Sequence, residues 1–193
     1  MGTLFLQESD ATMLLADILD FTALTKKKGA TVELAITLSR FYEHIATAAK
    51  SEGGRVIKLV GDGVLCAFVG VADHRARALR AVKKLLAGRE TINEIAKLSQ
   101  MPEIDYTVVV TTGHVLAGDL GADKLQGFDV IGTAVNRCFF LSHLATKRKV
   151  THLIDAETLI GLTGAALPAV REVAAATAAD TAGDETKLYE LTS

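Results

Sequence analysis

Apolar positions recur along the chain with two periods, one typical of strands and one typical of helices. Short apolar runs rich in β-branched residues predict a hairpin at about 55–69 and strands at about 12–18, 104–112, 115–117, 128–131, 150–154 and 188–191. Apolar residues three and four positions apart predict long helices at about 31–51 and 73–98, and shorter ones at about 21–28, 133–145 and 156–162. Residues 173–185, rich in Ala, Thr and Asp, predict a loop or a weak hairpin.

Turn and cap residues bound these elements. Gly53 and Gly54 are predicted to end the first long helix, and Asp73 to cap the start of the second. Gly113 and Gly118 are predicted to mark turns on either side of the short strand at 115–117. Strands that alternate with two long helices and end in smaller elements predict an α+β fold, in which helices cover a mixed sheet.

The composition indicates a single globular domain. The chain has 193 residues, of which 49% are hydrophobic, enough for one substantial core. The net charge of -2, without a basic run, argues against nucleic acid or an anionic membrane as a partner. No signal segment and no membrane-spanning apolar run is found, so we expect a cytoplasmic domain without membrane insertion. Cys66 and Cys138 are predicted to be reduced core residues, and none of the five scattered histidines is predicted to be a ligand.

Two acidic residues stand out at the ends of apolar strands. Asp62 occupies the tip of the hairpin between Gly61 and Gly63, which supply the positive φ that a tight turn demands. Asp17 ends the strand at 12–18. A carboxylate on a rigid turn can approach a metal ion or a phosphate closely. An ordinary polar turn residue at 62 and a helix cap at 17 explain the same pattern and remain alternatives.

Three motifs carry a resemblance to a known family. They are Asp-Ile-Leu-Asp-Phe-Thr at 17–22, Lys-Leu-Val-Gly-Asp at 58–62 and Phe-Asp-Val-Ile-Gly-Thr-Ala-Val-Asn at 128–136. In order and separation they resemble motifs of the class III nucleotide cyclases, the adenylate and guanylate cyclase family, with Asp20 in place of a glycine. The resemblance covers about residues 10–155 and implies a ferredoxin-like βαββαβ core with extensions. We therefore predict one domain, 1–193, in which 156–193 forms a C-terminal extension that completes the sheet.

The resemblance also implies a chemistry. In this family the 3′-hydroxyl of a nucleoside triphosphate attacks its own α-phosphate and pyrophosphate leaves, so no protein nucleophile is needed. Asp17 and Asp62 match the residues that hold two Mg²⁺ or Mn²⁺ ions, hard cations that prefer oxygen ligands. Backbone N–H groups near Phe21 and Thr22, at a helix start, are expected to meet the phosphates. Asp20 adds a negative charge there that glycine lacks.

Lys58 and Asp129 match the family's base-recognition pair. A lysine donor and a carboxylate acceptor complement the ring nitrogen and the amino group of adenine, so the resemblance implies ATP; guanylate cyclases carry a Glu and a Cys instead. The alternative is that the two residues form a structural ion pair. The family assembles head to tail, with the metals on one protomer and Lys58, Asp129 and Asn136 on the other, which implies a homodimer.

Two positions depart from the family pattern, and both departures remove positive charge. Asn136 matches the asparagine that orients the ribose, but Phe140 stands where the transition-state arginine is expected, one helical turn later. Arg137 lies about 100° around the helix and is a poor substitute. The phosphate-binding lysine of the family is also missing. When the tail is aligned on Tyr189, its position lies near Thr181.

The sequence therefore supports two main hypotheses. The first is an adenylate cyclase that makes cyclic AMP and pyrophosphate from ATP slowly, because Phe140 replaces the arginine. The second is a catalytically degenerate cyclase-homology domain that binds nucleotide or a partner and acts in regulation. A ferredoxin-like nucleic-acid module is a third possibility, but the hairpin lacks the aromatic and basic residues of RNA-recognition strands.

Overall fold

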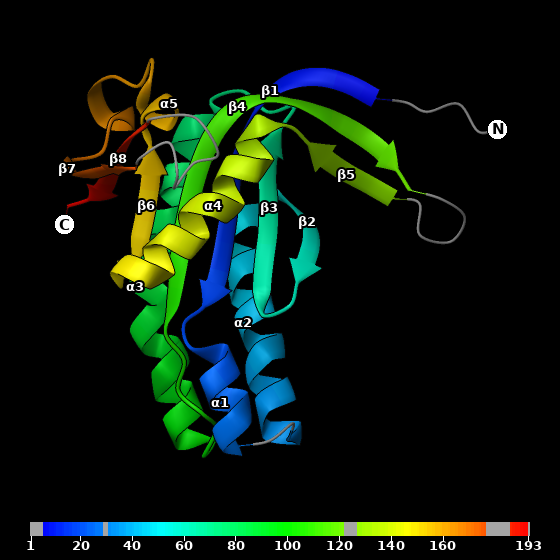
Figure 1. The fold of residues 1–193 in the computed structure, drawn as a ribbon, viewed down its shortest axis with the longest axis vertical. Coiled ribbons are helices and arrows are strands. Elements are labelled where there is room, and N and C mark those ends of the chain that lie inside the picture. Colours follow the sequence, from blue (N-terminus) through cyan, green and yellow to red (C-terminus); the bar gives the residue numbers. More distant parts are fainter. Residues whose placement is uncertain (1–5, 29–30, 122–126, 177–185, 193) are drawn as a thin grey trace.

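The computed structural model describes residues 6–28, 31–121, 127–176 and 186–192, which form one eight-stranded sheet with helices on both faces (Figure 1). The first half of the chain contains β1 (Leu6–Ile18), α1 (Phe21–Lys28), α2 (Val32–Ser51), β2 (Arg55–Val60), β3 (Gly63–Val69) and α3 (His74–Leu98). The second half contains β4 (Tyr106–Leu120), β5 (Gly127–Ile131), α4 (Thr133–Arg148), β6 (His152–Asp155), α5 (Ala156–Leu159), η2 (Gly164–Ala166), β7 (Val170–Ala176) and β8 (Thr186–Leu191).

The strand order confirms the predicted ferredoxin-like core. The sheet runs β2-β3-β1-β4-β6-β8-β7, and β5 pairs with β4 outside this path. Its first four strands are antiparallel, and with α2 and α3 as crossovers they make the βαββαβ unit. β6 joins β4 in parallel, and β8 and β7 follow as antiparallel strands beyond it. The C-terminal segment thus adds to one side of the core sheet.

Helices bury both faces of the sheet, which explains the unbroken apolar run in β1. α2 and α3 cover one face, where Leu14 packs with Phe41 and Leu79. α4 crosses the opposite face (Figure 1). There Met13 packs with Leu141. Since successive side chains of a strand point to opposite faces, neighbouring residues of β1 belong to different cores. No helix within the described residues is both long and apolar enough to cross a membrane.

Two strands are longer than predicted. β4 is continuous from 106 to 120, so the prediction of two strands with turns at Gly113 and Gly118 is wrong. Gly113 has a packing role instead: a Cβ there would lie 3.3 Å from the Cβ of Ala134, so its absence lets α4 approach the sheet. β1 pairs with β4 from Leu6 to Ile18, and the polar first half of β1 becomes strand through this pairing alone.

The helices begin and end close to the predicted positions, but one predicted capping hydrogen bond is absent from the described residues. Asp73 does precede α3, but it has a φ of 54° and its side chain caps no N–H group, so the predicted capping bond is wrong. Thr31 provides such a bond for α2, where its hydroxyl accepts from the Leu34 N–H at 3.2 Å. Gly53, with a φ of 81°, follows α2 as expected. Cys66 and Cys138 are buried free thiols, which confirms that prediction.

Candidate active site

Asp17 and Asp62 meet at one end of the sheet. Asp17 faces Gly63 across the β1–β3 ladder, and Asp62 immediately precedes Gly63 in the β2–β3 turn. A Cβ at Gly63 would lie 2.9 Å from Oδ1 of Asp17. Glycine at position 63 therefore leaves room for the Asp17 carboxylate against the hairpin. This steric requirement is separate from the requirement for glycine in the turn.

Burial disfavours the negative charge of both carboxylates. Burial and the neighbouring Asp62 carboxylate raise the pKa of Asp17 to about 6. Burial also raises the pKa of Asp62. Partly desolvated anions that repel each other favour a bound cation. This donor set suits Mg²⁺ or Mn²⁺, which take part of their coordination from water and substrate oxygens. In the described part of the chain no third His, Cys, Asp or Glu completes a ligand cluster around such a pair.

The carboxylate pair opens into a pocket of about 340 Å³ under α4. Its other walls come from the ends of β1 and β2 and from one side of α4. They are formed by Leu15, Val60, Phe139, Ser142, His143 and Thr146. We call this space the carboxylate pocket. It falls within the size range of small-molecule sites, and it combines apolar walls with a few polar groups.

Tyr42 holds the turn that carries Asp62. Its hydroxyl, on α2, donates to the carbonyl of Gly61 at 2.6 Å. Burial and the Asp62 carboxylate raise the pKa of Tyr42, which places its hydroxyl within the electrostatic reach of the carboxylate pocket. This contact could not be predicted from the sequence, because Tyr42 lies on a helix whose other partly buried residues simply pack on the core.

Asp20 adopts the conformation expected of a glycine. Its φ of 54° turns the chain between β1 and α1, and its carbonyl accepts from the Leu24 N–H at 3.0 Å. Asp tolerates this left-handed region better than most residues, so the substitution preserves the turn. Phe21 begins α1 and packs partly against the core, whereas Thr22 is exposed. The first N–H groups of α1 thus start next to the strand end that carries Asp17.

Lys58 and Asp129 lie together on the surface of one chain. Nζ of Lys58, on β2, donates to Oδ2 of Asp129, on β5, at 2.6 Å, and the two side chains are 40% and 29% exposed. The other carboxylate oxygen of Asp129 accepts from the Val130 N–H. The pair has the proximity that base recognition requires, and it also matches the alternative of an ion pair. Neither residue lines the carboxylate pocket.

Asn136 and Phe140 are exposed on α4, one turn apart, and Phe140 is 43% exposed. Arg137, in contrast, takes part in a buried network around Asp155. Its Nε lies 3.1 Å from Oδ2 of Asp155, and its guanidinium also donates to the carbonyl of Thr112 at 2.8 Å. Arg137 is therefore committed to the core and cannot replace a cation at position 140.

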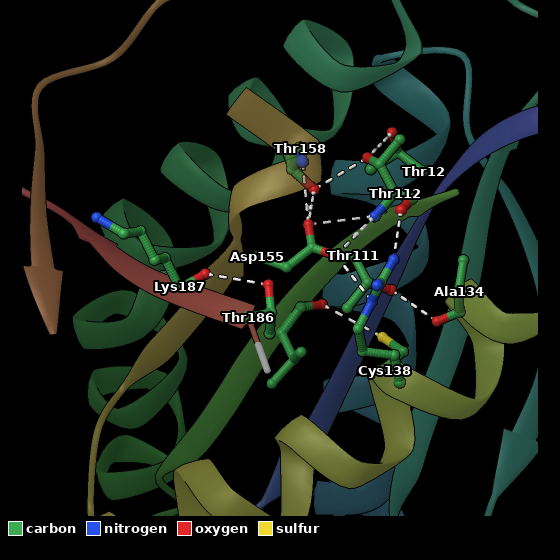
Figure 2. Close-up of polar contacts among 11 residues, drawn as sticks. Thr12, Thr111, Thr112, Ala134, Cys138, Asp155, Thr158, Thr186 and Lys187 are labelled. Atoms are coloured by element: carbon green, nitrogen blue, oxygen red, sulfur yellow. Dashed lines mark hydrogen bonds and ion pairs between the residues drawn. The ribbon is translucent and has the colours of Figure 1, made fainter. Parts of the chain in front are cut away.

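The Asp155 network was not anticipated from the sequence. Asp155 is fully buried, caps α5 by accepting from the N–H and hydroxyl of Thr158, and also accepts from the Thr112 N–H (Figure 2). Hydroxyl contacts continue from Thr158 through Thr112 to Thr12. Burial raises the pKa of Asp155 to about 6, against the opposing effects of Thr158 and Arg137. Thr181, near which the family's lysine was placed, lies outside the described residues.

Comparisons with known proteins show what this chain is similar to. A family model described as the adenylate and guanylate cyclase catalytic domain matches residues 6–165. An uncharacterized protein of Mycobacterium tuberculosis is 29% identical over 157 residues, which are 80% of this chain and 26% of that protein. The chain thus spans about a quarter of the length of the curated relatives it matches.

Solved structures show the same fold. The adenylyl cyclase CyaB from P. aeruginosa aligns with a TM-score of 0.80 and 20% identity, covering 98% of this chain and 97% of that one. A guanylyl cyclase aligns with a TM-score of 0.74 and 19% identity, covering 96% and 92%. Enzymes named for either purine nucleotide therefore share this architecture, and the choice of base depends on individual side chains.

Proposed function

Because this chain belongs to the adenylate and guanylate cyclase catalytic domain family, we propose that it is a slow adenylate cyclase that converts ATP to 3′,5′-cyclic AMP and pyrophosphate. The observation that carries the proposal is the convergence of Asp17 and Asp62 at the carboxylate pocket. Two carboxylates at the end of a rigid sheet fit divalent cations, which would neutralise charge on the transferring phosphoryl group.

The side chains have distinct roles in this proposal. Asp17 and Asp62 hold the cations, and backbone N–H groups near Phe21 and Thr22 meet the phosphates. The 3′-oxygen attacks the α-phosphorus and its proton passes to solvent, while the bond from the α-phosphorus to the bridging oxygen breaks and pyrophosphate leaves with that electron pair. The chain supplies position and charge rather than a covalent intermediate.

We propose that Lys58, Asp129 and Asn136 come from a second copy of the chain. The support is their position: Lys58 and Asp129 form their own surface pair away from the carboxylate pocket, and Asn136 is exposed on α4. A head-to-tail homodimer would bring these groups to the nucleotide held by the partner's carboxylates, giving two equivalent sites.

Product identification and complementation test this function. The purified protein with ATP and Mn²⁺ should form cyclic AMP and pyrophosphate. Asp17→Ala and Lys58→Ala chains should each be inactive alone, and their mixture should regain up to about half of the activity per heterodimer, since one of two sites is intact. A mixture that stays inactive despite verified subunit exchange would contradict the shared site.

A degenerate regulatory domain remains the second candidate, and Phe140 favours it. An exposed aromatic ring stands where a guanidinium is expected, so charge on the phosphates has less support. This candidate predicts nucleotide binding without turnover. Binding of ATP with Mn²⁺ but no cyclic AMP after prolonged incubation would favour it over the slow enzyme.

A further inference from the structure

The carboxylate pocket contains a histidine that the motifs do not single out. His143 lies on α4, three residues after Phe140, and its exposed side chain lines the same pocket as Asp17 and Asp62. It belongs to the same chain as these carboxylates. Its position therefore does not depend on how two copies assemble.

The imidazole of His143 is available to a ligand. No other side chain or backbone group in the described ranges hydrogen-bonds or pairs with it. The wall around it is already organised, since Ser142 is buried and its carbonyl accepts from the Thr146 hydroxyl at 3.2 Å. A neutral imidazole has one N–H donor and a protonated one has two, so His143 can donate in either state.

The described lining of the carboxylate pocket has no cationic side chain that could bind phosphate oxygens, so the N–H donor of His143 is important. The described lining includes two carboxylates but neither lysine nor arginine. Position 140 is a phenylalanine, and Arg137 is paired with Asp155 inside the fold. A polyphosphate bound through cations at Asp17 and Asp62 would thus meet one side chain in the lining that can place an N–H on its oxygens.

We propose that His143 binds the phosphate groups of the nucleotide in the carboxylate pocket of its own chain, in place of cationic side chains that the pocket lacks. This inference rests on the proposed function. It assigns a residue that contacts the terminal phosphates, and therefore also the pyrophosphate product, whatever the base. A charge-assisted hydrogen bond of this kind contributes about tenfold or more in affinity.

Calorimetry with four probes tests the assignment: Mn²⁺ alone, pyrophosphate with Mn²⁺, ATP with Mn²⁺, and AMP with Mn²⁺. His143→Ala should weaken pyrophosphate and ATP about tenfold while leaving Mn²⁺ and AMP within twofold. His143→Arg should bind pyrophosphate at least as tightly as the starting protein. His114→Ala, which removes another exposed histidine on β4, is the matched control and should change none of the four affinities.

The outcomes separate the inference from the function on which it rests. Unchanged pyrophosphate and ATP affinities in a folded His143→Ala protein would overturn the role of His143 and leave the cyclase proposal standing. Weaker binding of Mn²⁺ alone would also overturn it, because His143 would then be a metal ligand. Failure of the starting protein to bind ATP with Mn²⁺ would overturn the proposed function itself.

A second readout detects the contact directly. In the NMR spectrum, the imidazole C–H signals that disappear in His143→Ala should shift when diamagnetic Mg²⁺ and pyrophosphate are added to the starting protein. The signals of His114 should stay in place. Signals of His143 that do not move at saturating pyrophosphate would contradict the proposed contact.

Discussion

Lys58 on β2 and Asp129 on β5 form an ion pair of 2.6 Å although 71 positions separate them in the chain. Both side chains are partly exposed, so the pair contributes only about 0–1 kcal/mol to stability. A ligand that satisfies both groups can therefore replace the pair at little cost. The arrangement places a donor and an acceptor side by side on the surface, which is the pattern that the edge of adenine complements.

If this pair recognises the base, as proposed, it predicts a preference for adenine. ATP should bind at least about tenfold more tightly than GTP, because guanine would leave a donor or an acceptor unsatisfied. The Lys58→Glu/Asp129→Cys double variant should reverse the preference. Equilibrium binding of both nucleotides with Mn²⁺ measures it, and equal affinities in the starting protein would remove adenine recognition from the proposal.

Phe140→Arg should raise the rate of cyclic AMP formation about a hundred- to a thousandfold, the usual value of one preorganised donor in a transition state. The phenylalanine is 43% exposed, so its replacement should change the unfolding free energy by less than about 1 kcal/mol. Turnover and melting temperature are measured together. A stable Phe140→Arg protein with unchanged turnover would show that position 140 does not face the reacting phosphates.

Tyr42→Phe should weaken the binding of ATP with Mn²⁺ about threefold to tenfold, because the Gly61 carbonyl loses its hydrogen bond and the Asp62 turn gains freedom. Stability should fall by about 1 kcal/mol. Tyr189→Phe, on β8, is the matched control, since no described group hydrogen-bonds to that hydroxyl. Loss of stability without loss of affinity would restrict Tyr42 to a structural role.

The buried carboxylates predict a dependence of stability on pH. Asp155 and Asp17 each have a folded-state pKa of about 6, above the value of an unfolded chain. Through these two groups the folded protein binds more protons than the unfolded one between about pH 4 and pH 6, and their contribution to the unfolding free energy should fall as pH rises through this window. Burial lowers the pKa of His44, His74 and His152, whose contribution changes in the opposite direction as they titrate. For the fully buried Asp155 this contribution is up to about 3 kcal/mol, and it is smaller for the partly exposed Asp17, where solvent screens the charge.

Asp155→Asn tests the assignment, because asparagine keeps an acceptor for the Thr112 and Thr158 N–H groups but does not ionise. Urea unfolding at pH 4.5, 5.5 and 7 should show a smaller loss of unfolding free energy with rising pH than in the starting protein, and the difference between the two slopes measures the contribution of Asp155. The groups that face Asp155 are Arg137 of α4 and the hydroxyl of Thr158. An identical pH slope in both proteins would show that Asp155 stays ionised throughout this range.

The sequence by itself determined most of the secondary structure and the α+β class, and the resemblance carried by its motifs implied the ferredoxin-like core. Apolar periodicity located α2 and α4 because each helix buries one apolar stripe, and β3 because both of its faces are buried. These requirements determine the residue types at nearby positions of the sequence. The three motifs located the carboxylates and the exposed pair of Lys58 and Asp129 for the same reason: each motif is local. The continuity of β4 through Gly113 was beyond this reasoning, because only pairing with β1 overrides a local turn signal.

Only the tertiary structure decided which of these side chains lie together. The sheet order brings Asp17 beside Gly63, while the crossing of α4 places His143 in the lining of the carboxylate pocket and Arg137 against Asp155. Residues 137 and 143 are almost two turns apart on α4. The sequence does not reveal which parts of the fold each side of that helix contacts. Contacts between distant segments depend on the packing of the whole sheet, and so the partners of Tyr42, Arg137 and His143 emerge only when the chain is folded.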